Sequence, residues 1–143
     1  MVVKRLAIVE RGKGKHNFSC FATEDVGTYA LMGYGGSARE AMADIKNLAI
    51  EYKALAAERG EEFPDVEFDF RFDVGAFFDY YPLDVTAAAK YIGINPSVLR
   101  QYATALRVPK QGQINKIREG LSKLASDLGT GLLIEQPTMS YIR

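Results

Sequence analysis

Residues 85–104 constrain the fold most, because they fit two short helices joined by a tight turn. The apolar side chains of the first helix recur every three or four residues, as one buried helical face requires, at Val85, Ala88, Ala89 and Ile92. Gly93 ends this helix, since glycine enters the left-handed conformation without steric cost. Asn95 can cap the next helix, and Pro96 suits its first turn. The stretch therefore predicts a helix-turn-helix motif.

The outer side of the second helix carries side chains suited to DNA. Arginine and glutamine are among the best readers of base edges, and hydroxyls and cations hold phosphates. We assign base reading to Ser97, Arg100 and Gln101, phosphate contacts to Lys90, Arg107 and Lys110, and include Asn95 and Thr104 in the site. The alternative is an ordinary helical hairpin with a solvated outer face.

The net charge of zero hides an asymmetry along the chain. Residues 1–75 contain 10 Lys or Arg and 13 Asp or Glu, whereas residues 76–143 contain 8 and 5. Residues 90–123 hold seven basic side chains and one acidic one, Glu119. An electropositive segment around the motif is what a phosphate-facing surface needs.

The composition indicates in which compartment the protein works and whether it binds a metal or a cofactor. No apolar run approaches the ~20 residues that span a bilayer, and the N-terminus has no signal-peptide core, so we expect no membrane association. Cys20 is the only cysteine, which excludes an internal disulfide and suits a reducing cytoplasm. His16 is the only histidine, and we expect neither a metal site nor a cofactor.

The first half of the chain reads as three strands, a helix and a fourth strand. Residues 4–10 and 17–22 predict a hairpin, and residues 29–34 predict a third strand. Ser37 and Glu40 form a capping box at the start of a helix that runs to about residue 58. Residues 66–73 alternate apolar and charged side chains, which predicts a strand with one face on the core.

The second half reads as helical. Residues 76–81 predict a short helix, and residues 111–128 predict a longer one. We therefore divide the chain into residues 1–74 (an α+β module), residues 75–128 (a helix-turn-helix DNA-binding module) and a tail, residues 129–143. The tail could add a strand, cross to a partner subunit or lie loose.

The pairing of these parts resembles HicB-type antitoxins over about residues 4–128. The segment from Gly33 to Ala41, its helix and Phe63-Pro64 are similar to the turn-helix-proline segment of that family. The resemblance implies a degraded ribonuclease-H-like first module and a lambda-repressor-like, all-α second module. It also implies neutralisation of a small mRNA-cleaving, HicA-like toxin and repression of the protein's own operon through operator DNA.

Two other functions compete with this one. A ribonuclease-H-like sheet raises the question of a metal-dependent nuclease, which needs carboxylates converging on divalent ions. We interpret the candidate carboxylates as a helix cap and as solvent-exposed side chains: Glu10, Glu40, Asp44 and Asp69. We therefore expect that the protein is not an enzyme. A stand-alone regulator whose first module binds a ligand or a protein remains open.

We further expect a homodimer or a higher symmetric oligomer. One recognition helix buries little surface, and helix-turn-helix proteins compensate with two half-sites about 34 Å apart. We place at least one interface on Val98, Val108, Leu132, Leu133 and Ile134, whose side chains have no obvious partners. The strand edges of the first module offer another.

Overall fold

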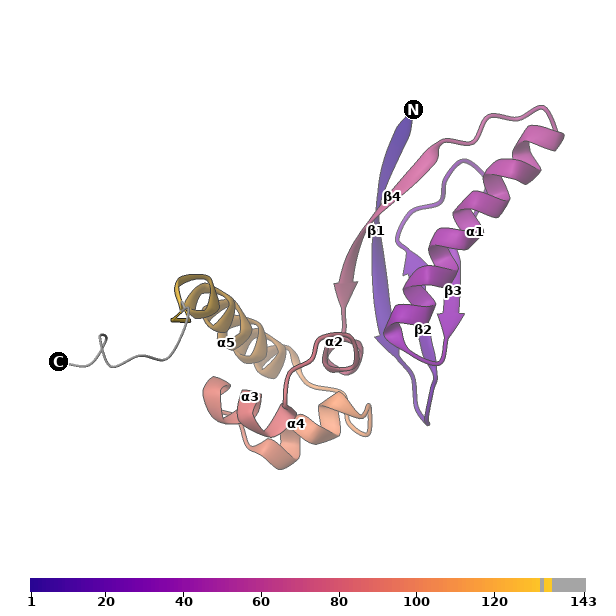
Figure 1. Cartoon of the computed structure of the whole chain (residues 1–143). Coiled ribbons are helices and arrows are strands. Elements are labelled where there is room, and N and C mark those ends of the chain that lie inside the picture. The colour runs from indigo at the N-terminus through magenta and orange to yellow at the C-terminus, as the bar shows by residue number, and fades with distance from the viewer. Residues whose placement is uncertain (132, 135–143) are drawn as a thin grey trace.

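The computed structural model describes residues 1–131, 133 and 134 of the chain, and these residues form four strands and five helices (Figure 1). The elements are β1 (Val2–Arg11), β2 (Phe18–Ala22), β3 (Met32–Gly35), α1 (Ala38–Glu58), β4 (Asp65–Phe72), α2 (Val74–Tyr80), α3 (Val85–Ile92), α4 (Pro96–Ala103) and α5 (Gln111–Thr130).

The sheet is mixed, with strand order β3-β2-β1-β4. β1 pairs antiparallel with β2, and β2 pairs antiparallel with β3, as the predicted hairpin requires. β4 returns along α1 and pairs parallel with β1. The order of three strands, a helix and a strand is compatible with the expectation for this half of the chain.

Helix α1 lies against one face of the sheet and approaches β3 very closely (Figure 1). A Cβ atom at Gly33 would lie 2.6 Å from both the Ala41 carbonyl oxygen and the Ile45 nitrogen, so only glycine permits this approach. The core between helix and sheet contains Ala7, Val9, Phe18, Cys20, Leu31, Ala41, Ile45 and Phe63.

The predicted capping box at the start of α1 is confirmed, with one difference. The Glu40 backbone N–H donates to Ser37 Oγ at 3.1 Å. The Glu40 carboxylate accepts from the backbone N–H of Gly36 at 2.6 Å, one residue before the predicted donor. Two otherwise unpaired donors at the helix start are therefore satisfied.

The expectation of an α+β module followed by a separate all-α, lambda-repressor-like helix-turn-helix module is wrong. The described residues form one small α+β fold, because α2 belongs to both halves. Ala76 lies in the core of the sheet, whereas Val74 and Phe78 pack on the core of the later helices. Phe72 of β4 also stacks on Tyr80 of α2, with ring centroids 5.2 Å apart.

Polar contacts strengthen the same junction. Asp73 caps α2 by accepting from the Ala76 N–H at 2.8 Å, and it also accepts from the backbone N–H of Arg11 in β1. Asp79 of α2 accepts from the Ala38 N–H at the start of α1, at 2.9 Å. These contacts leave no free linker between the sheet and the helices, which is why the helices form no module of their own.

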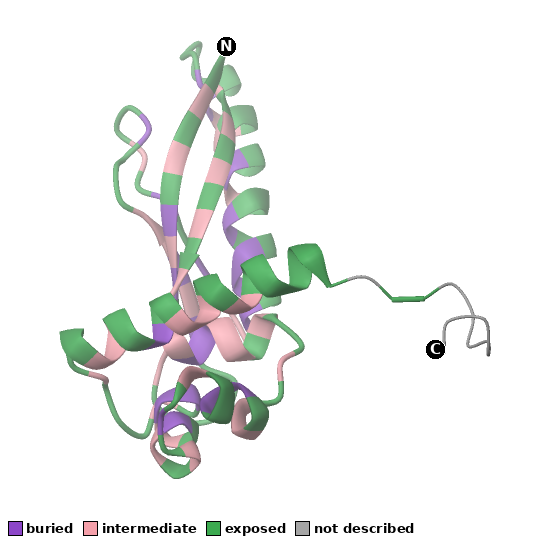
Figure 2. Cartoon of the chain, turned by 90° about the vertical axis from the view of Figure 1, so that its left-hand side faces the viewer, coloured by how far each residue is buried: buried purple, intermediate pink, exposed green. Residues whose placement is uncertain are grey.

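The later helices pack around a small core, visible as a cluster of buried segments in the lower half of Figure 2. Ala88, Ala89, Leu99, Tyr102 and Ile117 supply it. Helix α5 crosses α3 at Gly120, where an added Cβ would lie 2.6 Å from Ile92 Cγ1.

No helix in the described part of the chain is both long enough and apolar enough to cross a membrane. The possibilities raised for the tail fall mainly on residues 132 and 135–143, which lie outside the described residues, and so does the interface role of Leu132.

Candidate nucleic-acid interface

The turn between α3 and α4 fixes the angle of the two helices. Gly93 adopts a left-handed conformation with φ of 88°, and its N–H donates to the Ala89 carbonyl at 2.9 Å. Ile94 then inserts between the helices and is 7% exposed. Asn95 accepts from the Ser97 N–H at 2.8 Å and caps α4, as predicted. The sequence around the turn therefore sets where the outer face of α4 points.

One side chain of the sheet, that of Arg11, contacts the end of α4. The Arg11 guanidinium donates to the carbonyl of Ala103, the last residue of α4, at 3.0 Å, and lies over the Phe18 ring. Asp73 anchors the Arg11 backbone, and burial raises the pKa of its carboxyl against the opposing effect of the N–H groups that it accepts. The sheet thus acts as the support for α4.

The inner face of α4 is buried as expected. Leu99 is 0% exposed, and Tyr102 and Ala103 are each 5% exposed. Val98 is partly buried against this core, so the expectation that it has no partners within the chain is wrong. The helix therefore offers a single outer side to a ligand.

The outer side of α4 carries most of the predicted base-reading residues. Ser97, Arg100 and Thr104 are exposed, whereas Gln101 is half-buried. The Arg100 guanidinium donates to Thr86 Oγ1 at the start of α3, at 2.9 Å. The Thr104 hydroxyl donates to the Arg100 carbonyl at 2.8 Å, so it is already engaged within the helix. Arg100 and Ser97 are the most available of these side chains.

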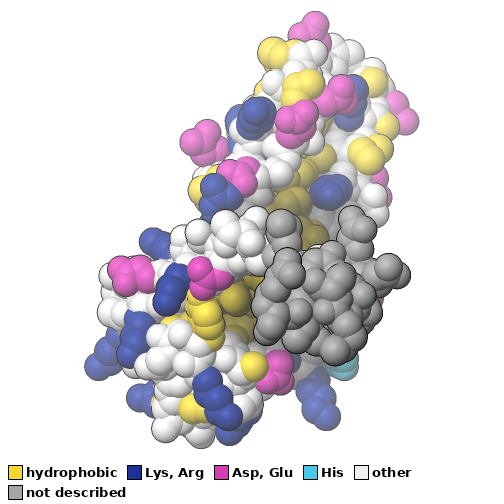
Figure 3. Space-filling view, turned by 60° about the vertical axis from the view of Figure 1, so that its left-hand side comes forward, with side chains coloured by type: hydrophobic (Ala, Val, Ile, Leu, Met, Phe, Trp, Pro, Cys, Tyr) yellow, Lys and Arg dark blue, Asp and Glu magenta, His cyan; other side chains and the backbone are white. Residues whose placement is uncertain are grey.

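The predicted phosphate-binding residues lie exposed on both sides of α4 in the sequence. Lys90 lies near the end of α3, and Arg107 and Lys110 lie in the connector to α5. Residues 85–118 contain six basic side chains and no Asp or Glu. Figure 3 shows Lys and Arg side chains spread over the helical lower part of the molecule. The chain from the start of α3 into α5 therefore carries cations and no carboxylate.

The sequence analysis missed Thr86 as the partner of Arg100. Helical periodicity could have indicated this partner, because it places position 86 outside the buried face that contains Val85 and Ala89. It also missed Leu106 of the connector, which is 79% exposed, whereas Val108, which it did name as an apolar side chain without partners, is 84% exposed. Ala105 precedes them with φ of 61°, a left-handed conformation that turns the chain sharply after α4.

The carboxylates considered for a nuclease form other contacts and do not come together at one site. Glu40 caps α1, and Asp44 accepts from the Tyr34 N–H at 2.8 Å. Asp69 forms an ion pair with Arg71 on β4. Among the described residues, no three His, Cys, Asp or Glu side chains gather closely enough to hold a metal ion.

The outer face of α4, with its capped start and cationic surroundings, is therefore the candidate site. No family model, curated protein or solved structure matches this chain.

Proposed function

We propose that the chain is a cytoplasmic DNA-binding repressor of the antitoxin type. On this proposal it represses its own operon through α4 and neutralises a small toxin that cleaves mRNA. One observation carries the DNA-binding part: the exposed side of α4 presents Ser97 and Arg100, and residues 85–118 contain six cations and no carboxylate.

Physical chemistry supports this reading of α4. A helix presents side chains to base edges in the major groove, and arginine pairs with guanine through two hydrogen bonds. Thr86 accepts from Arg100 and so limits the directions in which the guanidinium points. Lys90, Arg107 and Lys110 would hold phosphates and supply a sequence-independent part of the affinity.

A symmetric assembly follows from the small size of the site. α4 has eight residues, too few for tight and selective binding by one copy. A two-fold dimer or a higher symmetric oligomer would present two copies of α4 to two half-sites.

The toxin-neutralising part rests on the resemblance of residues 33–64 to HicB-type antitoxins. It is supported by the strand order of the first half and by the capping box at Ser37 and Glu40.

Selection from a library of randomised DNA duplexes tests the DNA-binding part. We expect the full-length chain to enrich one sequence with two related half-sites, and its affinity to fall steeply with added salt. Recovery of random sequences only, or no binding at low salt, would contradict the proposal.

The neighbouring gene tests the toxin part. We expect it to encode a short basic protein that stops growth when expressed alone and is tolerated when this chain is co-expressed. If no such gene exists while one DNA sequence is still selected, the chain is a stand-alone regulator instead.

A further inference from the structure

Strand β4 forms one edge of the sheet, and its outer edge has no partner strand among the described residues. It is eight residues long, without a proline or a glycine. An uncovered edge of this length is a template for another strand, and monomeric proteins usually shorten, bend or block such edges.

The backbone direction of β4 identifies the groups on that outer edge. The N–H of Asp65 donates to the Met1 carbonyl at 3.2 Å, and the N–H just past the strand, at Asp73, donates to the Val9 carbonyl at 3.0 Å. Because successive residues of a strand direct their N–H and C=O groups to opposite sides, the odd-numbered residues pair with β1. The even-numbered residues, Val66, Phe68, Phe70 and Phe72, therefore direct theirs outward.

The side chains of the same four residues form an apolar row. All four lie on the α1 face of the sheet and are only half-buried, so the stripes along β4 in Figure 2 alternate between intermediate and exposed. Helix α1 leaves the outer side of this row open. Ile50 of α1 is 68% exposed, and Lys46 lies over the Phe70 ring at 5.5 Å. The residues therefore offer apolar surface at an edge that has no partner strand among the described residues. Of the outward backbone groups, the Phe70 carbonyl accepts from Arg71 Nη1 at 3.2 Å, and a second strand would have to replace this contact.

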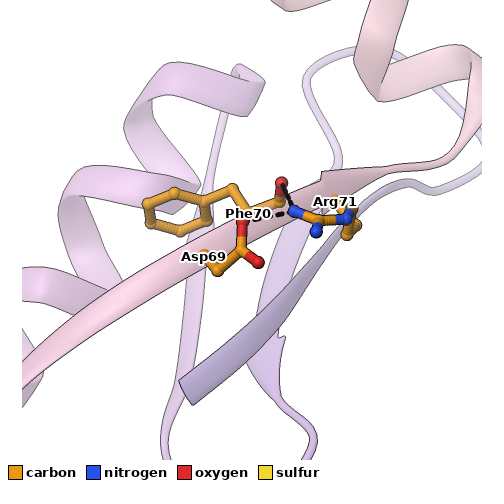
Figure 4. A network of polar contacts seen from close by, with 3 residues as sticks. All are labelled: Asp69, Phe70 and Arg71. Carbon is orange, nitrogen blue, oxygen red and sulfur yellow. Dashed lines mark hydrogen bonds and ion pairs between the residues drawn. The ribbon is translucent and has the colours of Figure 1, made fainter. Parts of the chain in front are cut away.

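The opposite face of β4 carries charges in a fixed order: Glu67, Asp69 and Arg71. Asp69 and Arg71 form an ion pair within the strand, and each side chain is 61% exposed (Figure 4). Read in the antiparallel direction, this order places the cationic end of one strand against the acidic end of another.

We propose that two copies of the chain join through β4, with the two strands antiparallel about a two-fold axis at Asp69. Directly opposite residues share a face, so the sum of their numbers must be even for the apolar rows to meet. A two-fold axis at Asp69 places Phe68 opposite Phe70 of the second copy and Val66 opposite Phe72. All four outward residues of each strand then find partners.

Charge excludes one neighbouring register, and the number of outward residues that find partners excludes the other. It places Glu67 opposite Arg71 of the second copy, twice by symmetry, and the two Asp69 carboxylates at the axis each retain Arg71 of their own strand. An axis at residue 68 would set Glu67 against Asp69, which repels. An axis at residue 70 would pair only three outward residues of each strand.

This pairing specifies how the symmetric assembly proposed above is built, but it does not require that the chain bind DNA. A chain that dimerises through another surface and still selects one DNA sequence would overturn the β4 pairing alone. A dimer joined at β4 that selects no DNA would overturn only the proposed function.

Disulfide trapping of the full-length chain tests the register directly. Residues at the axis form a non-hydrogen-bonded pair with Cα atoms about 4.5 Å apart, within the range that a disulfide spans. We expect D69C to form a covalent dimer under mild oxidation. The matched control is E67C, whose Cα atoms would be about 14 Å apart across the axis, too far for a disulfide. The buried Cys20 thiol does not compete.

Charge exchange provides a second test by sedimentation equilibrium. We expect Arg71→Glu to raise the dimer dissociation constant roughly tenfold, because two attractive pairs become repulsive. Glu67→Arg combined with Arg71→Glu restores the original complementarity and should return the constant to near its original value. A monomer at all concentrations, equal trapping of D69C and E67C, or no rescue by the double variant would overturn the proposal.

Discussion

The sheet with α1 and the group of helices α3–α5 are built on different principles. The sheet half has a core with large buried side chains such as Phe18, Leu31 and Ile45, and glycines that bring α1 onto β3. The helical half has a smaller core, made of Ala88, Ala89, Ile94, Leu99, Tyr102 and Ile117, and an apolar groove of about 560 Å³ lies between α2 and α5. Residues 1–75 have an acidic excess and residues 76–143 a basic one.

This difference suggests a division of work within one fold. The sheet half has the larger core and carries an edge strand without a partner among the described residues, and the helical half is basic and presents α4. Helix α2 couples the two, since it supplies residues to both cores. Substitutions in either core, at the contact between α1 and β3, and at the polar junction around Asp73 test this difference between the two halves.

The largest expected effects come from truncating one fully buried side chain in each half. Ile45→Ala and Leu99→Ala should each lower the free energy of unfolding by about 3 kcal/mol, because both side chains are 0% exposed. Because α2 couples the cores, we expect each variant to unfold in one thermal transition by circular dichroism and by tyrosine fluorescence. Two separate transitions in Leu99→Ala would show that the helices unfold on their own.

A smaller effect is expected where α1 meets β3. Gly33→Ala should lower the free energy of unfolding by about 2 kcal/mol, because the new Cβ meets backbone atoms of α1 that cannot turn aside. The control is Gly112→Ala at the start of α5, where no atom lies within 4 Å and the change should stabilise by about 0.5 kcal/mol. Urea unfolding measures both, and equal effects would contradict the close packing at Gly33.

The smallest effect concerns the pH dependence of the junction. Burial raises the pKa of Asp73 above its ordinary value of 3.8, so the folded chain keeps a proton that the unfolded chain has already lost. The contribution of Asp73 to stability should therefore fall as pH rises from about 3.8 through the folded value. Urea unfolding of the parent chain and Asp73→Asn between pH 3 and 7 measures it. A rise in the parent's stability relative to the variant over this range would mean that the N–H groups outweigh burial.

Local patterns along the chain predict most of the elements. The alternation in residues 66–73 predicts β4, and the capping box at Ser37 predicts the start of α1, because both depend on neighbouring residues alone. The α3–α4 turn at Gly93 follows for the same reason. In the candidate site, the cap at Asn95 and the exposure of Arg100 were likewise predictable.

Contacts between distant residues were not predictable in this way. The role of α2 depends on Arg11, which reaches Asp73 and Ala103 across 62 and 92 residues of chain. The parallel pairing of β1 with β4 depends on how α1 crosses the sheet, which alternation does not encode. The half-burial of Gln101 depends on where the connector folds back, since its carbonyl accepts from the N–H of Leu106.

The most direct test of the proposed function compares Arg100→Ala with Arg59→Ala on the selected DNA sequence and on an unrelated duplex. Both changes remove one exposed positive charge, but Arg59 lies at the far end of α1. We predict that Arg100→Ala loses about 1–3 kcal/mol on the selected sequence and much less on the unrelated duplex, because base reading is lost. Arg59→Ala should leave both affinities unchanged. Equal losses on the two duplexes for Arg100→Ala would contradict a base-reading role for α4.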